Sequence, residues 1–150
     1  MLGILDSSDQ LAVDANCAFD RTRALEYGKA LAPYNLRWFE EPGDPLDYAL
    51  MAELAEFYEA PLATGENLFS TSDVVNLVRY GGMRPDRDVV QTDTPQSYGI
   101  ATLAKTIAAI AGYGWQPAQL MPHGGNQMSL HIAGGFGLGL CEAYPDVFGM

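Results

Sequence analysis

The chain has 150 residues, of which 48% are hydrophobic and 18% are charged, and its net charge is −11. Such a composition predicts one folded globular domain and excludes a disordered chain. We expect no nucleic acid and no membrane as partner. Clustered Lys and Arg are needed to bind nucleic acid or anionic lipid, and no apolar run approaches the ~20 residues that cross a bilayer.

Short strand-like runs alternate with longer helical patterns along the chain. Apolar runs predict strands near 11–13, 36–39, 61–63, 88–91, 120–121 and 137–141, and helical spacing predicts helices at 21–32, 47–58, 71–80, 100–111 and 128–133. Ser70 and Ser72 are candidate caps for the third helix. Strict alternation predicts an α/β fold with a parallel sheet, because each parallel crossover needs its helix. Roughly six βα units fit either part of an eight-stranded barrel or an open, doubly wound sheet.

Three acidic residues follow successive predicted strands at equal intervals: Asp14, Glu40 and Glu66. The C-terminal ends of parallel strands share one edge, where barrels and open α/β sheets carry their sites. Three converging carboxylates repel one another, so without a cation at least one is expected to stay protonated. Carboxylate oxygens suit Mg²⁺. The sequence therefore predicts one magnesium ion held by these three side chains.

The three acids can also be interpreted without a metal, and a neighbouring glutamate competes with one of them. Any one acid by itself is explained more simply as a cap for the helix that follows its strand. Glu41 competes with Glu40, but adjacent strand residues point to opposite faces, so only one of them can join the cluster, and the equal interval selects Glu40. Asn16 and Asn67 follow two of the strands and are predicted to hydrogen-bond to the ligands or to a substrate.

Asp93 and His123 follow the fourth and fifth predicted strands, and Glu142 follows the last one. An aspartate beside a histidine fixes the imidazole tautomer and raises its basicity, which suits general acid–base catalysis. The alternative is a loop histidine held by the backbone. Glu142 can hydrogen-bond a reacting oxygen or simply be solvated. The glycine-rich run 134–139 lacks the order of a nucleotide-binding loop and is expected to allow close backbone approach.

The two cysteines, Cys17 and Cys141, form neither a disulfide framework nor a metal-binding pair in the sequence. A reducing, cytoplasmic location is the simplest expectation.

Several motifs together resemble the mandelate racemase/muconate lactonizing branch of the enolase superfamily. The resemblance implies strands three to eight of a (βα)₈ barrel, with the first three acids binding Mg²⁺. It also implies that His123, supported by Asp93, is an acid/base, and that Glu142 lies near the enolate oxygens. The motifs are Val13-Asp14-Ala15-Asn16, Phe39-Glu40-Glu41-Pro42, Gly65-Glu66-Asn67, Asp93 and His123.

Longer stretches look most like the D-tartrate dehydratases of this branch: EPGDPLDYAL, ATGENLFS, RYGGMRPDRD and PHGGNQMSL. The implied reaction converts D-tartrate to oxaloacetate and water through an enediolate, with a small hydroxy acid as substrate. Alternatives are racemisation or dehydration of another sugar acid, a non-catalytic metal-binding remnant, and a glycosidase-like barrel that uses two carboxylates.

The family's catalytic Lys-x-Lys motif does not occur in the chain, whose lysines are Lys29 and Lys105. The resemblance places that motif on an earlier strand, after a capping domain. We therefore expect residues 1–150 to be the C-terminal part of a barrel domain, without the capping domain and the first two strands. Such a chain is expected to be inactive alone, whereas a full-length parent is expected to be a homo-oligomer.

Overall fold

The computed structural model describes residues 2–144, in which five parallel strands are each followed by a helix. The strands lie side by side in chain order: β1 (Ala12–Asp14), β2 (Trp38–Glu40), β3 (Leu62–Thr64), β4 (Val89–Thr92) and β5 (Leu120–Pro122). The helices are α1 (Arg21–Leu31), α2 (Tyr48–Ala55), α3 (Thr71–Tyr80), α4 (Ile100–Ala111) and α5 (Gln127–Phe136). Short 3₁₀ helices span Leu2–Ile4, Ser8–Gln10, Ala32–Tyr34 and Pro117–Gln119.

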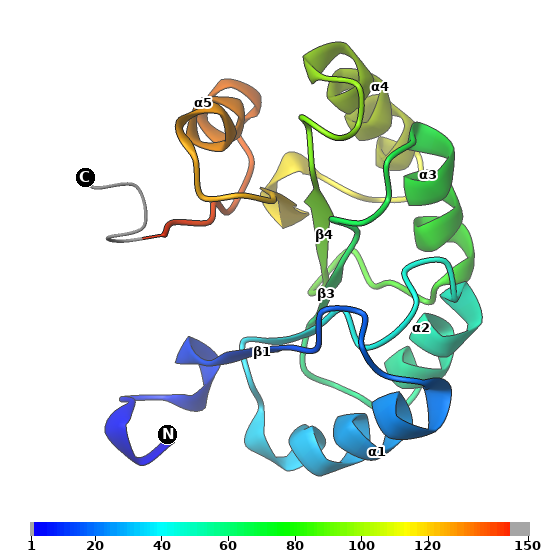
Figure 1. Ribbon diagram of the computed structural model, residues 1–150, viewed down its shortest axis with the longest axis vertical. Coiled ribbons are helices and arrows are strands. Elements are labelled where there is room, and N and C mark those ends of the chain that lie inside the picture. Colours follow the sequence, from blue (N-terminus) through cyan, green and yellow to red (C-terminus); the bar gives the residue numbers. More distant parts are fainter. Residues whose placement is uncertain (1, 145–150) are drawn as a thin grey trace.

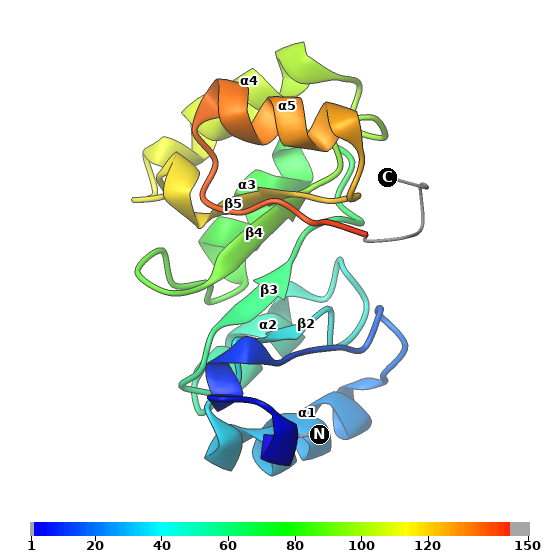
Figure 2. The same cartoon turned by 90° about the vertical axis from the view of Figure 1, so that its left-hand side faces the viewer.

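The arrangement is that of a partial TIM-type barrel, as predicted. Helices α1 to α4 line one side of the curved sheet, and the first 3₁₀ helix and α5 lie on the other side (Figure 1). A second view shows α5 beside α4, above β5 (Figure 2). All four strand pairs are parallel, which requires each connection to cross over through a helix. Among residues 2–144, no helix is long and apolar enough to cross a membrane.

Four of the five helices begin at a side chain that accepts a hydrogen bond from the first turn. Asp20, Asp47, Ser70 and Asn126 each accept from the backbone N–H three residues further on. Caps of this kind stabilise a helix by about 1 kcal/mol each. Of the two predicted caps for α3, Ser70 is therefore the one used.

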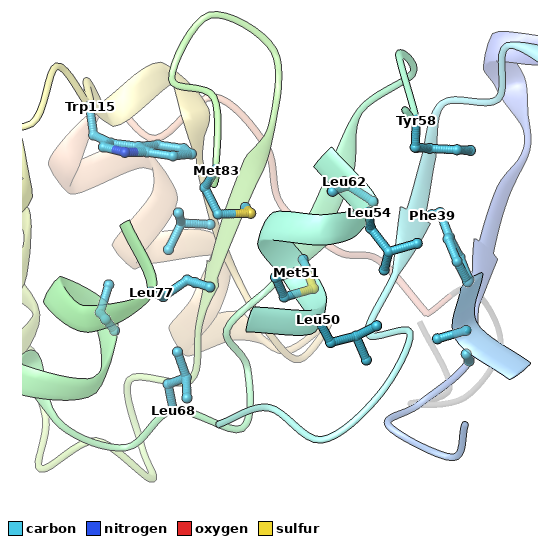
Figure 3. Close-up of a cluster of buried hydrophobic side chains, with 14 of the residues drawn as sticks. Phe39, Leu50, Met51, Leu54, Tyr58, Leu62, Leu68, Leu77, Met83 and Trp115 are labelled. Carbon is cyan, nitrogen blue, oxygen red and sulfur yellow. The ribbon is translucent and has the colours of Figure 1, made fainter. Parts of the chain in front are cut away.

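The main core lies between the strands and helices α1 to α4. Its fully buried side chains include Phe39, whose ring packs edge-on against Tyr58 at 6.0 Å between centroids. Figure 3 shows this cluster extending from Phe39 to Trp115. A second, smaller cluster forms on the other face of the sheet, from Ala63, Val89 and Met121 with Trp38 and Leu140. Alternation of side chains along each strand separates the two clusters.

A buried ion pair joins the opposite, N-terminal ends of β3 and β4. The Asp88 carboxylate is fully buried and accepts hydrogen bonds from the Arg84 guanidinium and from the Leu62 N–H. The same guanidinium donates to the carbonyl oxygens of Tyr58 (2.7 Å) and Ala60 (3.0 Å). The loops before β3 and β4 are thus held together by one hydrogen-bonded network.

The predicted boundaries are close to those observed, with two systematic differences. Helices α3 and α4 begin and end where predicted, whereas α2 is shorter and α5 is longer. The strands β1 to β4 extend further toward the C-terminus than the apolar runs do. Asp14 pairs with Glu40, and Glu40 pairs with Ala63, so the acidic residues themselves belong to the ladder.

The predicted last strand at 137–141 was wrong, and the described chain has five βα units instead of six. Gly137 adopts a left-handed conformation (φ 65°) that ends α5, and the Leu138 N–H donates to Ala133 in the same helix. Gly139 then donates to the Pro117 carbonyl, and a Cβ there would collide with the backbone of Ala118. Glycine thus allows the close backbone approach that was predicted, but the segment's hydrogen bonds do not form a ladder.

Candidate functional site

The predicted site residues gather at the C-terminal ends of the strands, around one cavity of about 550 Å³. Asp14 and Glu40 end β1 and β2, and Glu66 follows β3 by two residues. Six of the eight predicted residues line the cavity: Asp14, Asn16, Glu40, Glu66, His123 and Glu142. The cavity's other lining residues are Arg37, Trp38, Met121, Leu140, Cys141, Ala143 and Tyr144.

Two side chains within the barrel hold the carboxylate of Glu40. The Trp38 indole N–H donates to Oε2 at 2.6 Å, and the Gln91 amide donates to Oε1. Glu40 is buried, and this burial raises its pKa above 4.5 together with the charges of Asp14 and Glu142, although the two hydrogen bonds oppose the shift. Glu40 is therefore a fixed carboxylate in an environment that disfavours its charge.

The side chain of Asp14 is held by a hydrogen bond within the turn that follows β1. The backbone N–H of Asn16 donates to Asp14 Oδ1 at 2.7 Å, and Asn16 adopts a left-handed conformation with φ 47°. This local hydrogen bond turns the chain sharply after β1, as Asx turns do. The Asn16 residue therefore lies at the rim of the cavity, close to the carboxylate that it stabilises.

The surroundings of Glu66 disfavour its charged form. Burial, and the charges of Glu41, Glu40 and Glu142, raise its pKa to about 7, although His123 opposes the shift. This agrees with the expectation that one carboxylate of the cluster tends to stay protonated when no cation is present.

His123 and Asp93 form the predicted dyad. His123 Nδ1 lies 2.8 Å from Asp93 Oδ2, and Nε2 faces the cavity, 3.7 Å from Glu66 Oε2. Burial lowers the pKa of His123, but the hydrogen bond to Asp93 and the nearby carboxylates outweigh it and raise the pKa above 6.5. The backbone also holds His123, through its N–H to Thr92, so both alternatives for this histidine describe part of its environment.

Asp93 supports the histidine from behind and does not line the cavity. Its carboxylate accepts hydrogen bonds from the Gln96 backbone (3.0 Å) and side chain (2.7 Å) as well as facing His123. Burial acts to raise the pKa of Asp93, but these hydrogen bonds lower it below 3.8. Asp93 is thus an ionised carboxylate that favours the protonated form of the imidazole.

Glu142 anchors the segment after α5 to the loop that carries His123. Its Oε2 accepts from the Gly124 N–H at 2.7 Å and from the Tyr144 hydroxyl at 2.6 Å. Since the predicted strand does not form, Glu142 reaches the cavity from an irregular segment. Its carboxylate nonetheless lines the same cavity as the acids and His123, and it is not simply solvated.

Asn67 does not line the cavity. Its amide donates to the carboxylate of Glu41 at 2.6 Å, and Glu41 points away from the cavity into the protein. The structure therefore agrees with the prediction that only one of the two adjacent glutamates joins the cluster. The second glutamate has its own polar partners, Asn67 and Cys17.

The cavity offers donors that suit a hard divalent cation. Among the described residues, Glu66, His123 and Glu142 form a compact group whose possible ligand atoms lie within 4.8 Å of one another. Asp14 and Glu40 line the same cavity but lie outside that compact group. Most of the possible ligand atoms are carboxylate oxygens, and a bound cation would offset the burial and the neighbouring charges that raise the pKa of Glu66.

The fold and this cavity define a class of protein: part of a parallel βα barrel with a cluster of acids and a His–Asp dyad at the C-terminal ends of its strands. The chain belongs to the family of enolase C-terminal domain-like proteins, and the match covers residues 4–146.

Similar proteins include sugar-acid dehydratases. The L-talarate/galactarate dehydratase of Salmonella typhimurium is 34% identical over 128 residues, and the arabinonate dehydratase of Saccharolobus solfataricus is 35% identical over 133 residues. These matches cover 85% and 83% of this chain but 30% and 33% of the relatives. The crystal structure of L-talarate dehydratase from Polaromonas sp. JS666, complexed with Mg and L-glucarate, superposes with a TM-score of 0.75 at 30% identity. That match covers 89% of this chain and 36% of the other, so the chain spans about a third of the length of its relatives.

Sequence reasoning missed the residues that hold the site residues in place. Trp38 and Gln91 bind Glu40, Gln96 binds Asp93, and Tyr144 binds Glu142. Strand alternation could have identified the first two, because Trp38 shares a face with Glu40, and Gln91 shares one with Asp93. Gln96 and Tyr144 depend on loop conformation and left no periodic signal.

Proposed function

We propose that this chain is the metal-binding part of a magnesium-dependent acid-sugar dehydratase, a hydro-lyase. The observation that carries the proposal is the shared cavity, which brings three strand-end acids together with a histidine whose Nε2 faces them. The similarity of the chain to two sugar-acid dehydratases, at 34% and 35% identity, supports the same reaction class.

Asp14, Glu40 and Glu66 are the proposed ligands of one Mg²⁺ ion. When bound, the ion supplies a Lewis acid that offsets the negative charge developing on the substrate carboxylate as its α-proton leaves. Trp38 and Gln91 hold Glu40 in place for this role. Similarity to a structure complexed with Mg supports the choice of metal.

His123 is the proposed acid of the second step, in which the β-hydroxyl leaves as water. Asp93 stabilises the imidazolium, and its hydrogen bond raises the pKa of His123, which favours the protonated form that an acid needs. The proton passes from His123 to the departing hydroxyl oxygen as the C–O bond breaks. Glu142, and Asn16 at the rim, are placed to hydrogen-bond the substrate.

The substrate is proposed to be a four- to six-carbon hydroxy diacid, with D-tartrate as the particular candidate. Loss of the α-proton and the β-hydroxyl from D-tartrate gives an enol that tautomerises to oxaloacetate. Galactarate and L-talarate are the second candidates, supported by the 34% identity to a dehydratase of those acids. D-tartrate is supported instead by the motifs EPGDPLDYAL and PHGGNQMSL.

Turnover requires a base for the α-proton, which the family supplies from a Lys-x-Lys motif that this chain lacks. The test is therefore made on two proteins: the 150-residue chain, and a longer product of its reading frame that contains such a motif. With Mg²⁺, the longer protein is expected to convert D-tartrate to the 2-keto acid oxaloacetate. A coupled malate dehydrogenase assay measures this product. The chain alone is expected to form none. Keto-acid formation from galactarate or L-talarate but not from D-tartrate would select the second candidates, and none from any of the three would refute the dehydratase.

A further inference from the structure

Glu41 is a fully buried carboxylate directly after the proposed ligand Glu40. Its backbone has φ 40°, in the left-handed region that residues with a β-carbon rarely adopt. Its Oε1 atom is buried and accepts no hydrogen bond from the described residues. Burial, an unusual backbone conformation and an unsatisfied oxygen all oppose folding, and such features concentrate at functional sites.

Polar contacts of Glu41 connect three strands at the rim of the sheet. Its Oε2 accepts a hydrogen bond from the Cys17 thiol at 2.8 Å and from the Asn67 amide at 2.6 Å. Its carbonyl accepts from the Cys17 N–H at 2.8 Å, and its own N–H donates to Ala63 at 3.0 Å. One residue after β2 thus holds the loop after β1 and the loop after β3.

The two loops held by Glu41 are those that carry proposed metal ligands. Cys17 follows Asp14 by three residues, and Asn67 directly follows Glu66. We propose that Glu41 is a positioning residue, which fixes the loops of Asp14 and Glu66 at the separation that a shared divalent cation requires. This inference rests on the proposed metal site and adds a residue that does not itself touch the ion.

The charge of Glu41 strengthens the same role. Glu41 contributes to the raised pKa values of Glu66 and Cys17, so its field reaches both loops. Its carboxylate accepts hydrogen bonds from neutral donors, a thiol and an amide. A negative charge at this position would attract a divalent cation at the neighbouring ligands.

The test exchanges the donor and the acceptor of the Glu41–Asn67 hydrogen bond. Asn67→Asp removes the donor by placing a carboxylate against Glu41, and Glu41→Leu removes the acceptor for both Asn67 and Cys17. The double variant Glu41→Gln/Asn67→Asp restores one donor and one acceptor with nearly unchanged side-chain shapes. Glu26→Gln, on the exposed face of α1, is the control for loss of one charge.

Mg²⁺ affinity is measured by calorimetry on the 150-residue chain and each variant, with thermal melting as the check on folding. Each single variant is expected to weaken Mg²⁺ binding about 10- to 100-fold, the usual effect of losing a group that orients a metal ligand. The double variant is expected to return to within about threefold of the original affinity, because the two changes are coupled. Glu26→Gln is expected to bind Mg²⁺ as the original chain does.

Two results would overturn the positioning role: unchanged Mg²⁺ affinity in a folded Glu41→Leu variant, or a double variant that binds no better than the weaker single variant. If the single variants do not fold, the double variant decides by the same threefold criterion. An original chain that binds no Mg²⁺ would instead refute the proposed metal site.

A metal-free readout tests the contact with Cys17 separately. In a Cys141→Ser background, Cys17 is the remaining thiol. Glu41→Leu is expected to accelerate its reaction with a thiol reagent, because the acceptor of the thiol hydrogen bond and its charge are lost. An unchanged reaction rate would show that Glu41 does not hold the loop after β1.

Discussion

The two ends of the same strands have opposite electrostatic character. At the N-terminal ends, Arg84 and Asp88 form a buried pair whose nitrogen and oxygen atoms hydrogen-bond to each other and to backbone groups. At the C-terminal ends, carboxylates share a cavity, and the pKa of Glu66 rises to about 7 because burial and neighbouring acids disfavour its charge. The first arrangement is complete within the chain, whereas the second is the one that we propose a cation completes. In barrel enzymes, stability and activity are divided in this way between the two faces.

Removing the acid of the N-terminal network is expected to have the largest effect. Asp88→Ala leaves the Arg84 guanidinium without its carboxylate and the Leu62 N–H without its acceptor. We expect the free energy of unfolding to fall by roughly 3 to 5 kcal/mol, as when one partner of a buried ion pair is removed. Urea denaturation measures this. Asp86→Ala, two residues away and exposed, should leave the midpoint nearly unchanged, and an equal loss in both variants would contradict the comparison.

Removing an acid at the C-terminal ends of the strands is expected to raise the free energy of unfolding instead of lowering it. Glu66→Gln replaces a carboxylate whose pKa is raised to about 7 with a neutral group of the same shape. At a pH of about 8 and without metal, the free energy of unfolding should rise by roughly 1 to 3 kcal/mol, since each pKa unit corresponds to about 1.4 kcal/mol. A loss of stability under these conditions, measured by urea denaturation, would show that Glu66 is not destabilised by its surroundings.

The pH dependence of stability offers a third test. The folded-state pKa of Glu66, about 7, lies above its ordinary value of 4.5, so the protonated form favours the folded state. The resulting stability is complete below pH 4.5 and is lost as the pH rises through 7. Denaturation midpoints of the metal-free chain should therefore fall across this range, and the fall should be smaller in Glu66→Gln. Saturating Mg²⁺ should oppose the fall at the upper end, and identical profiles with and without Mg²⁺ would argue against a cation at these acids.

Removing a helix cap is expected to have the smallest effect on stability. The caps of α3 and α5 can be compared directly. Ser70→Ala and Asn126→Ala each remove the side-chain acceptor at the start of α3 or α5. We expect each to lower the free energy of unfolding by about 1 kcal/mol. Because Asn126 follows His123 closely, a nuclear magnetic resonance titration of His123 should change in Asn126→Ala but not in Ser70→Ala. A change in both would mean that the loop after β5 is not held locally.

Much of the fold and of the site was predictable from local pattern. Helical spacing and caps located α3 and α4, and the equal intervals of Asp14, Glu40 and Glu66 placed three acids in one cavity. Strand alternation separated Glu40 from Glu41 correctly. These features follow from periodicity, which a single sequence records.

The features that failed depend on contacts distant in sequence. The run 137–141 has a strand-like composition, but helix termination at Gly137 and the approach of Gly139 to Ala118 prevent a ladder. The hydrogen bond between Asn67 and Glu41 also depends on how the chain turns after β3, and the role of Asn67 at the ligands or substrate stays a prediction. The support of Asp93 by Gln96 could not be inferred without the folded loop after β4.

The central claim is that Asp14, Glu40 and Glu66 hold one divalent cation. Calorimetric titration of the chain with Mg²⁺ tests it most directly, with Asp14→Asn, Glu40→Gln, Glu66→Gln, His123→Gln and Glu142→Gln as variants. The account predicts one ion per chain, binding lost in the first three variants, and binding retained in the last two. Binding that survives in Asp14→Asn and Glu40→Gln but disappears in His123→Gln and Glu142→Gln would contradict it, and would place the ion in the compact group of Glu66, His123 and Glu142.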